Sequence, residues 1–343
     1  MPVYVNLLIA LLVLSPIRIG WAESTSEENS DTIDPQSDDS EWDNPYPTEI
    51  WQRVVPELDL ESLPIVGPDT KSLPSGSAIK KRVEEEKKTA FSRFVITPHK
   101  PNYLLPLSYN SSPNNTPFLP LVEYVREEEV KFQFSFKLPL FTGLFHDRGQ
   151  IDFAYTNQSF WQLYNHEYSA PFRDTNHEPE VYLSYRLNHP FLGINADFIQ
   201  VGYSHQSNGR TQPLSRSWNR LYLNFVFERG DYYFGFKPWY RIKEDKKDDP
   251  LEPKGDDNRD IEFFMGHFEL TALYKPDHNT FSMVLRNNLR SENRGAIQVD
   301  WSFPLTTKLR GYVQFFNGYG ESMLDYNDSA NRIGFGLQLT DWL

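Results

Sequence analysis

Apolar and polar residues alternate with a period of two from about Pro98 to the C-terminus. The alternation recurs over segments of roughly ten residues, and it is the signal of a β-strand with one apolar face. Two candidate strands, Tyr103–Ser108 and Lys131–Leu140, join ten segments that carry a clear apolar row. Those ten segments are 151–161, 181–187, 199–203, 221–227, 232–236, 264–272 (with Phe264, Phe268, Leu270 and Ala272), 281–285, 297–303, 309–315 and 333–339.

The faces opposite these rows are polar. They carry Asp152, Thr156, Glu180, Arg186, Gln200, Arg220, Asn224, Lys237, His267, Glu269, Gln298, Asp300, Arg310 and Gln314. A soluble β-sandwich also alternates in this way. It rarely combines twelve strands and almost no helix with an apolar face as aromatic as this one.

The connections between the predicted strands alternate in length. Arg229-Gly230 and Lys275–Asn279 are short turns, whereas Asn110–Val130, Asn165–Pro179 and Ile242–Asp260 are long. Short turns at one end, long loops at the other and an even strand number are typical of outer-membrane barrels. The sequence therefore predicts an all-β fold, a twelve-stranded antiparallel transmembrane β-barrel whose apolar face meets lipid.

Composition changes this picture little. The chain has 343 residues and no cysteine, which excludes disulfides and thiolate metal sites. Its mean hydropathy of −0.59 would alone suggest a soluble protein. In a barrel, however, half of each strand is polar, so mean hydropathy is no guide to the membrane.

The N-terminus sets the compartment. Met1–Ala22 has the form of a signal peptide, with an apolar core, Leu7–Leu14, that is too short to span a bilayer, and small residues at Gly20 and Ala22. A retained membrane anchor is the alternative. We expect residues 1–22 to be a signal peptide and the mature protein to reach the bacterial outer membrane.

The negative charge lies mainly in the segment that follows. Ten acidic residues and no Lys or Arg occur between Glu23 and Glu49, so the rest of the chain carries −3 of the net −13. We predict an acidic, disordered extension over residues 23–97, in which the charged run Lys80–Lys88 is a solvated helix or coil, and a barrel domain over 98–343. Neither segment favours a nucleic-acid partner.

Asn157 departs from the apolar pattern, because it shares the lipid-facing parity of Tyr155 and Trp161. An unpaired amide in hydrocarbon costs several kcal/mol. The residue is expected either near the aqueous interface or paired across a contact between subunits.

Three other polar residues share a lipid-facing parity. His205 and Ser207 continue the row of Val201 and Tyr203, and Asn219 precedes the row of the next strand. Residues two apart on a strand are about 7 Å apart on one face, and the hairpin brings Asn219 beside His205. A serine needs a base to become a nucleophile, and a histidine base needs an orienting acceptor. Asn219 can fill that role, although a neutral amide stabilises an imidazolium less than a carboxylate does.

The residues around this group form a specific motif. It comprises His205-Gln206-Ser207-Asn208-Gly209-Arg210 and Ser215-Arg216-Ser217-Trp218-Asn219-Arg220-Leu221-Tyr222, with supporting stretches at Trp161–Leu163, Pro171–Asn176, Lys237–Tyr240 and Gly318–Ser322. The chain resembles the outer membrane phospholipase A family over about Pro98 to Leu343.

The resemblance implies a calcium-dependent enzyme that hydrolyses sn-1 and sn-2 acyl esters of glycerophospholipids, and lysophospholipids, near the outer leaflet. It implies Ser207 as nucleophile, His205 as base and Asn219 as its orienter. The backbone N–H of Gly209 and a calcium-bound water would form the oxyanion hole.

The resemblance also implies the calcium ligands and an active homodimer. The ligands would be the Arg210 carbonyl and Ser215 hydroxyl of one subunit and Ser169 of the partner subunit, with Asp257 at a second calcium position of the monomer. Asn157 stands where the family has a glutamine at the dimer contact.

Two other interpretations stay open on the residues alone. A small pore or adhesin would bind through its long loops, with the His205–Ser207 pair incidental. A soluble periplasmic sandwich would need no detergent for extraction. The many opposite charges of the predicted interior favour a barrel filled by its own side chains over an open pore.

Overall fold

A computed structural model of the chain describes residues 96–118, 125–191, 194–249, 251–306 and 309–340, together with Ile79, Arg82 and Glu86. The predicted signal peptide and most of the predicted extension lie outside the described residues, so these two expectations stay predictions. Among the described residues, no helix has both the length and the apolar character to cross a membrane.

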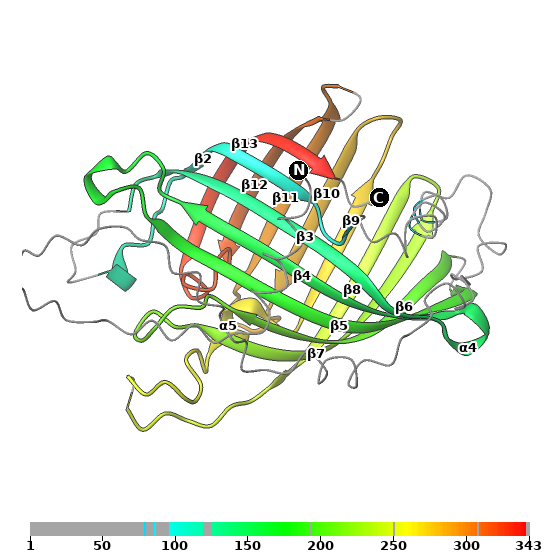
Figure 1. Cartoon of the computed structure of the whole chain (residues 1–343), viewed down its shortest axis with the longest axis horizontal. Coiled ribbons are helices and arrows are strands. Elements are labelled where there is room, and N and C mark those ends of the chain that lie inside the picture. The colour runs from blue at the N-terminus through cyan, green and yellow to red at the C-terminus, as the bar shows by residue number, and fades with distance from the viewer. Residues whose placement is uncertain are drawn as a thin grey trace, which may run out of the picture. The chain divides into compact units, whose positions relative to one another are not determined.

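Twelve long antiparallel strands form one closed sheet (Figure 1). Each strand pairs with its neighbours in the chain, and the last strand pairs with the first long one, which closes the barrel. The strands are β2 (Asn102–Asn110), β3 (Glu128–Gly143), β4 (Gly149–Trp161), β5 (Phe172–Phe191), β6 (Ile194–Ser207), β7 (Ser217–Arg229), β8 (Tyr232–Ile242), β9 (Phe268–Tyr274), β10 (Thr280–Asn287), β11 (Gly295–Pro304), β12 (Arg310–Tyr319) and β13 (Ser329–Thr340). A two-residue strand, β1 (Thr97–Pro98), pairs with β3 beside β2. The predicted twelve-stranded barrel is confirmed.

Within residues 96–340, the short helices that the structure describes lie in the connections between strands. They are η1 (Thr116–Phe118), α4 (Leu144–Asp147), η2 (His166–Tyr168) and α5 (Ile261–Met265). Two strand limits differ from those predicted. β5 begins at Phe172, so most of the expected loop 165–179 is strand, because its alternation simply continues upstream. Phe264 lies in α5 and not in a strand, since its packing against buried Met265 and Tyr326 suits a helical turn.

The two faces of the sheet follow the predicted parity. On β6, Val201 is 50% exposed and Tyr203 is 41% exposed, whereas Ser204 is fully buried. On β7, Leu221 is exposed and Arg220 is buried. Large apolar side chains therefore cover the outside, and polar side chains fill the inside.

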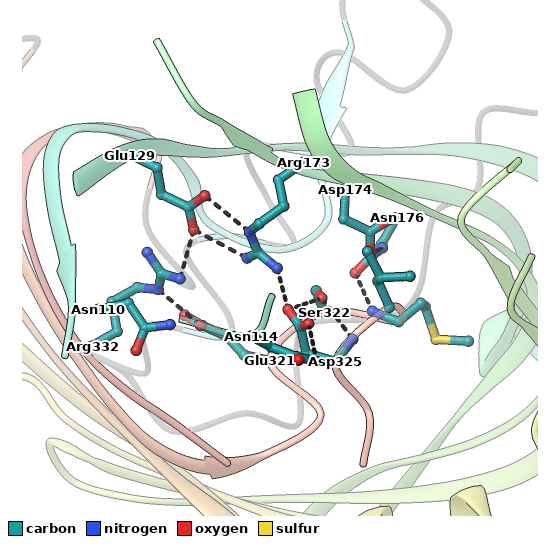
Figure 2. A network of polar contacts seen from close by, with 12 residues as sticks. Asn110, Asn114, Glu129, Arg173, Asp174, Asn176, Glu321, Ser322, Asp325 and Arg332 are labelled. Carbon is teal, nitrogen blue, oxygen red and sulfur yellow. Dashed lines mark hydrogen bonds and ion pairs between the residues drawn. The ribbon is translucent and has the colours of Figure 1, made fainter. Parts of the chain in front are cut away.

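A network of ion pairs occupies the interior (Figure 2). Glu129 on β3 bonds Arg173 on β5 at 3.0 Å and Arg332 on β13 at 2.6 Å. Arg332 also pairs at 2.8 Å with Glu321, which accepts a bond from Lys131 at 2.9 Å. These charges are almost fully buried and join strands that are not neighbours in the sheet. Removal of one partner from such a network costs about 3–5 kcal/mol, because the other charge stays buried.

A second interior network lies directly behind the outer faces of β6 and β7. Glu178 on β5 accepts bonds from Arg220 at 2.6 Å and from Ser204 at 3.1 Å. Lys100 pairs with the same carboxylate at 2.6 Å. Ser204 and Arg220, the neighbours of His205 and Asn219 in the chain, are thus held in place by interior hydrogen bonds.

Three described residues of the predicted extension contact the barrel domain. Ile79 is buried against Tyr233 and other interior residues of the barrel. Arg82 donates to the Pro98 carbonyl at 2.7 Å, and Glu86 pairs with Lys137 at 2.8 Å. Arg82 and Glu86 are helical, which is one of the two forms expected for this run, but they are partly buried and not solvated.

Candidate active site

The candidate site lies on the outer face of β6 and β7, at the end of the barrel that carries the long loops. The sheet register pairs His205 with Asn219 and Ser207 with Ser217. Tyr203 precedes His205 on the same face. All of these outward side chains except the exposed Tyr203 are partly buried.

One hydrogen bond joins the two predicted partners. His205 Nδ1 lies 2.9 Å from Asn219 Oδ1. Because an amide oxygen only accepts, the proton of this bond belongs to Nδ1, and Nε2 is left as a proton acceptor. Ser207 is two residues further along the strand on the same face, which is the arrangement that a serine and its base require.

Asn219 has two further partners that the sequence did not indicate. The Tyr203 hydroxyl donates to Asn219 Oδ1 at 2.6 Å. Asn219 Nδ2 donates to Glu244 Oε1 at 2.8 Å. Tyr203 could have been found by its parity, but Glu244 lies in a loop, where the period of two gives no information.

Asn208 organises the loop that follows Ser207. Its buried side chain donates to the Leu214 carbonyl at 2.8 Å and accepts from the backbone N–H groups of Arg216, at 2.9 Å, and of Arg210, at 3.3 Å. Gly209 between them has φ +61°, a left-handed conformation that suits glycine. The loop therefore holds the Gly209 N–H in a defined position one residue beyond Asn208.

His177 lies beside this loop and was also missed. The register places it between Asn157 and Ser207 along one row of the outer face. The Tyr155 hydroxyl lies 2.7 Å from His177 Nδ1, and Asn157 Nδ2 lies 3.4 Å from the same nitrogen. His177 Nε2 lies 3.8 Å from the position that a Cβ atom would take on Gly209. The lipid-facing parity of β5, extended upstream from Val181, would have indicated this histidine.

Asn157 is not isolated on the lipid-facing side. Besides its long contact with His177, its Oδ1 accepts a bond from Ser159 at 3.1 Å. The amide thus has partners within its own chain. A contact across a dimer stays a prediction.

Oxygen atoms that could bind a metal ion lie close together in the loops next to Ser207. Ser215 donates to Asp257 Oδ2 at 2.6 Å, and Gln212 donates to Asp257 Oδ1 at 2.7 Å. Lys247 pairs with the same carboxylate. Burial would raise the pKa of Asp257, but the hydrogen bonds from Lys247, Ser215 and Gln212 outweigh it and lower the pKa. A hydroxyl and an ionised carboxylate suit a hard cation such as calcium.

The other two predicted ligands are placed on separate loops. Arg210 follows Gly209, and its guanidinium donates to the carbonyls of Phe172 at 2.6 Å and Arg173 at 2.8 Å. Ser169 lies in an exposed turn after η2, with φ 56°. Within the described residues there is no group of three or more His, Asp or Glu side chains that could hold a metal. A calcium site here would have to rely on carbonyl and hydroxyl oxygens.

Comparisons with known proteins agree with this architecture. Residues 79–339 match the family model described as Phospholipase A1. The phospholipase A1 of Klebsiella pneumoniae is 38% identical over 250 residues, which is 72% of this chain and 83% of that protein. The phospholipase A1 of Escherichia coli K12 is 36% identical over 250 residues, which is 72% of this chain and 82% of that protein.

Solved structures agree as well. The outer membrane phospholipase A of Escherichia coli has a TM-score of 0.66 at 36% identity, over 73% of this chain and all of that one. A Salmonella typhi outer membrane phospholipase, solved as a dimer with bound calcium, has a TM-score of 0.67 at 35% identity, over 74% of this chain and 94% of that one. The chain therefore belongs to the phospholipase A1 family, the outer membrane phospholipases A, and is a phospholipase of the bacterial outer membrane.

Proposed function

We propose that the chain hydrolyses sn-1 and sn-2 acyl esters of membrane glycerophospholipids, and of lysophospholipids, with Ser207, His205 and Asn219 as its catalytic group. The observation that carries the proposal is the 2.9 Å bond between His205 Nδ1 and Asn219 Oδ1 on the lipid-facing side of the barrel. It leaves His205 Nε2 as a proton acceptor, and Ser207 lies two residues further along the same face of the strand. An ester of a bilayer lipid meets these side chains without entering the barrel.

The reaction is an acyl transfer in two halves. His205 Nε2 takes the proton of Ser207 as Oγ attacks the ester carbonyl, and the Gly209 N–H donates to the resulting oxyanion. The protonated His205 then gives its proton to the departing alcohol oxygen of the lysophospholipid. Water repeats these steps on the acyl-enzyme, with His205 again as base, and releases the fatty acid.

Calcium and a second subunit complete the proposal. The Arg210 carbonyl and Ser215 hydroxyl would hold calcium together with Ser169 of the partner subunit, and Asp257 would hold it at the second position. A calcium ion held by these residues would supply positive charge to stabilise the oxyanion, to which the Gly209 N–H donates one hydrogen bond. The calcium-bound dimer of the similar Salmonella typhi enzyme supports this part of the proposal.

Substitution of Ser207 tests the assignment. In detergent micelles, Ser207→Ala is expected to lower phospholipid hydrolysis by about 10⁴-fold or more, because the nucleophile is lost. Ser217→Ala is the matched control, since Ser217 is the cross-strand neighbour of Ser207 on the same face. Heat-modifiable migration on gels should report a folded barrel for both variants. Full activity of Ser207→Ala would remove Ser207 from this role.

Calcium and dimerisation need separate measurements. Excess EDTA should silence the wild-type enzyme, and chemical cross-linking should trap dimers under the conditions that support turnover. Unchanged turnover in EDTA would contradict the metal, and activity in a preparation of monomers alone would contradict the dimer.

A further inference from the structure

Glu244 contacts the proposed catalytic group from a loop that the alternating pattern does not cover. The residue lies two positions after the end of β8, and the last residue of β8, Ile242, pairs with Asn219 in the sheet. Its partly buried carboxylate accepts a 2.8 Å bond from Asn219 Nδ2. The loop therefore brings a carboxylate to the side of Asn219 that faces away from His205.

The hydrogen bonds around Asn219 determine which way its amide points. An amide has one accepting end and one donating end, whereas a carboxylate only accepts. The 2.6 Å bond from Tyr203 and the 2.9 Å bond from His205 both end on Asn219 Oδ1. Glu244 requires a donor and takes Nδ2. Rotation of the amide by half a turn would place an acceptor against the Glu244 carboxylate and a donor against His205 Nδ1.

The carboxylate also supplies a charge that the amide lacks. When His205 takes the proton of Ser207 it becomes a cation, and a neutral Asn219 stabilises that cation less than an aspartate would. Glu244 places a negative charge one hydrogen bond further along the same line. Hydrogen bonds in a chain polarise one another, so the charge strengthens the bond that Asn219 Oδ1 accepts.

We propose that Glu244 is a positioning residue for the hydrolysis, which acts through Asn219 to hold the His205 ring and to stabilise its protonated form. The inference rests on the proposed roles of Ser207 and His205. It adds a fourth member, and with it a carboxylate, to a catalytic group that is otherwise neutral.

The charge is tested by Glu244→Gln, which keeps the length of the side chain, and by Glu244→Ala, which removes it. We expect kcat to fall about 3- to 10-fold in the first variant and about 10-fold or more in the second, with KM changed less than about two-fold, because the interaction strengthens in the transition state. Asp245→Asn is the matched control: it removes one exposed charge from the neighbouring position of the same loop and should leave kcat unchanged.

A double-mutant cycle separates positioning from a general effect on the loop. If Glu244 acts through Asn219, then Glu244→Gln should have no further effect on kcat in an Asn219→Ala background. Calcium affinity, measured by isothermal titration calorimetry, should be the same in Glu244→Gln and in the wild type.

Either of two results would overturn the proposal: full kcat in both Glu244 variants, or the same fold loss with and without Asn219. Neither result would contradict the proposed role of Ser207, which is tested separately by Ser207→Ala.

Discussion

The inside and the outside of this barrel use the same polar side chains in opposite ways. In the interior, Glu129 bonds both Arg173 and Arg332 from strands that are not its neighbours, and all three side chains are almost fully buried. On the outer face, His205 bonds Asn219 through Nδ1, which leaves its other ring nitrogen as a proton acceptor. Polar groups that bond one another in the interior stabilise the barrel, whereas the histidine on the outer face keeps a ring nitrogen available for chemistry.

The largest effect is expected from the loss of the histidine on the outer face. His205→Ala should lower kcat by about 10⁴-fold, because neither half of the acyl transfer then has a base. The free energy of unfolding should stay within about 0.5 kcal/mol of the wild type, since the residue lies outside the packed interior. Hydrolysis assays and urea unfolding followed by tryptophan fluorescence measure the two quantities. His267→Ala, at an exposed histidine before β9, is the control. A large loss of stability in His205→Ala would show that the two regions are not separable.

A smaller effect is expected from the inner side. Glu129→Ala removes the shared partner of Arg173 and Arg332, so the barrel should lose about 3 kcal/mol of unfolding free energy. The activity of the molecules that remain folded should be close to that of the wild type. Glu128→Ala is the matched control, because the exposed pair of Glu128 with Arg126, at 3.9 Å, contributes about 1 kcal/mol at most. Equal stability of the two variants would contradict the structural role of the network.

The smallest effect is expected at Asp257, which lies outside the barrel interior but is ion-paired like the interior carboxylates. Its carboxylate, in an outer loop, is paired with Lys247. A bound calcium ion would compete with the Lys247 ammonium for this carboxylate. Lys247→Gln should therefore raise calcium affinity about ten-fold, because both side chains of the pair are only 7% exposed and a hydrogen bond to a charged group contributes about 1.5 kcal/mol or more. Isothermal titration calorimetry on the purified protein measures this change. Lys246→Gln is the control at an exposed lysine of the same loop. Unchanged or weaker affinity in Lys247→Gln would mean that the lysine does not compete.

Regular alternation made the barrel predictable from sequence. A strand has two faces, so parity alone assigns each residue to lipid or interior, and parity is enough to place His205, Ser207 and Asn219 on one face. Parity does not extend to irregular segments. Phe264 continued a row of alternating residues, yet it lies in α5, because a short helix can present an aromatic side chain to the same neighbours.

Pairings between distant residues were beyond the reach of the sequence. The charges of the interior were expected, but nothing in the chain indicated that Glu129 would meet Arg332 on β13. Glu244 and Lys247 lie in the loop after β8, where the distance to Asn219 or Asp257 depends on the backbone path and not on residue spacing.

The alternation along β6 has one more consequence. Ser204 and His205 are consecutive residues, yet Ser204 bonds Glu178 in the protein interior, while His205 belongs to the membrane side. One peptide unit therefore separates a side chain in the polar interior of the protein from a side chain that faces the membrane. Substitutions that change the lipid preference of the enzyme can therefore accumulate on the outer face of the sheet. The inward-facing residues that stabilise the barrel can stay unchanged.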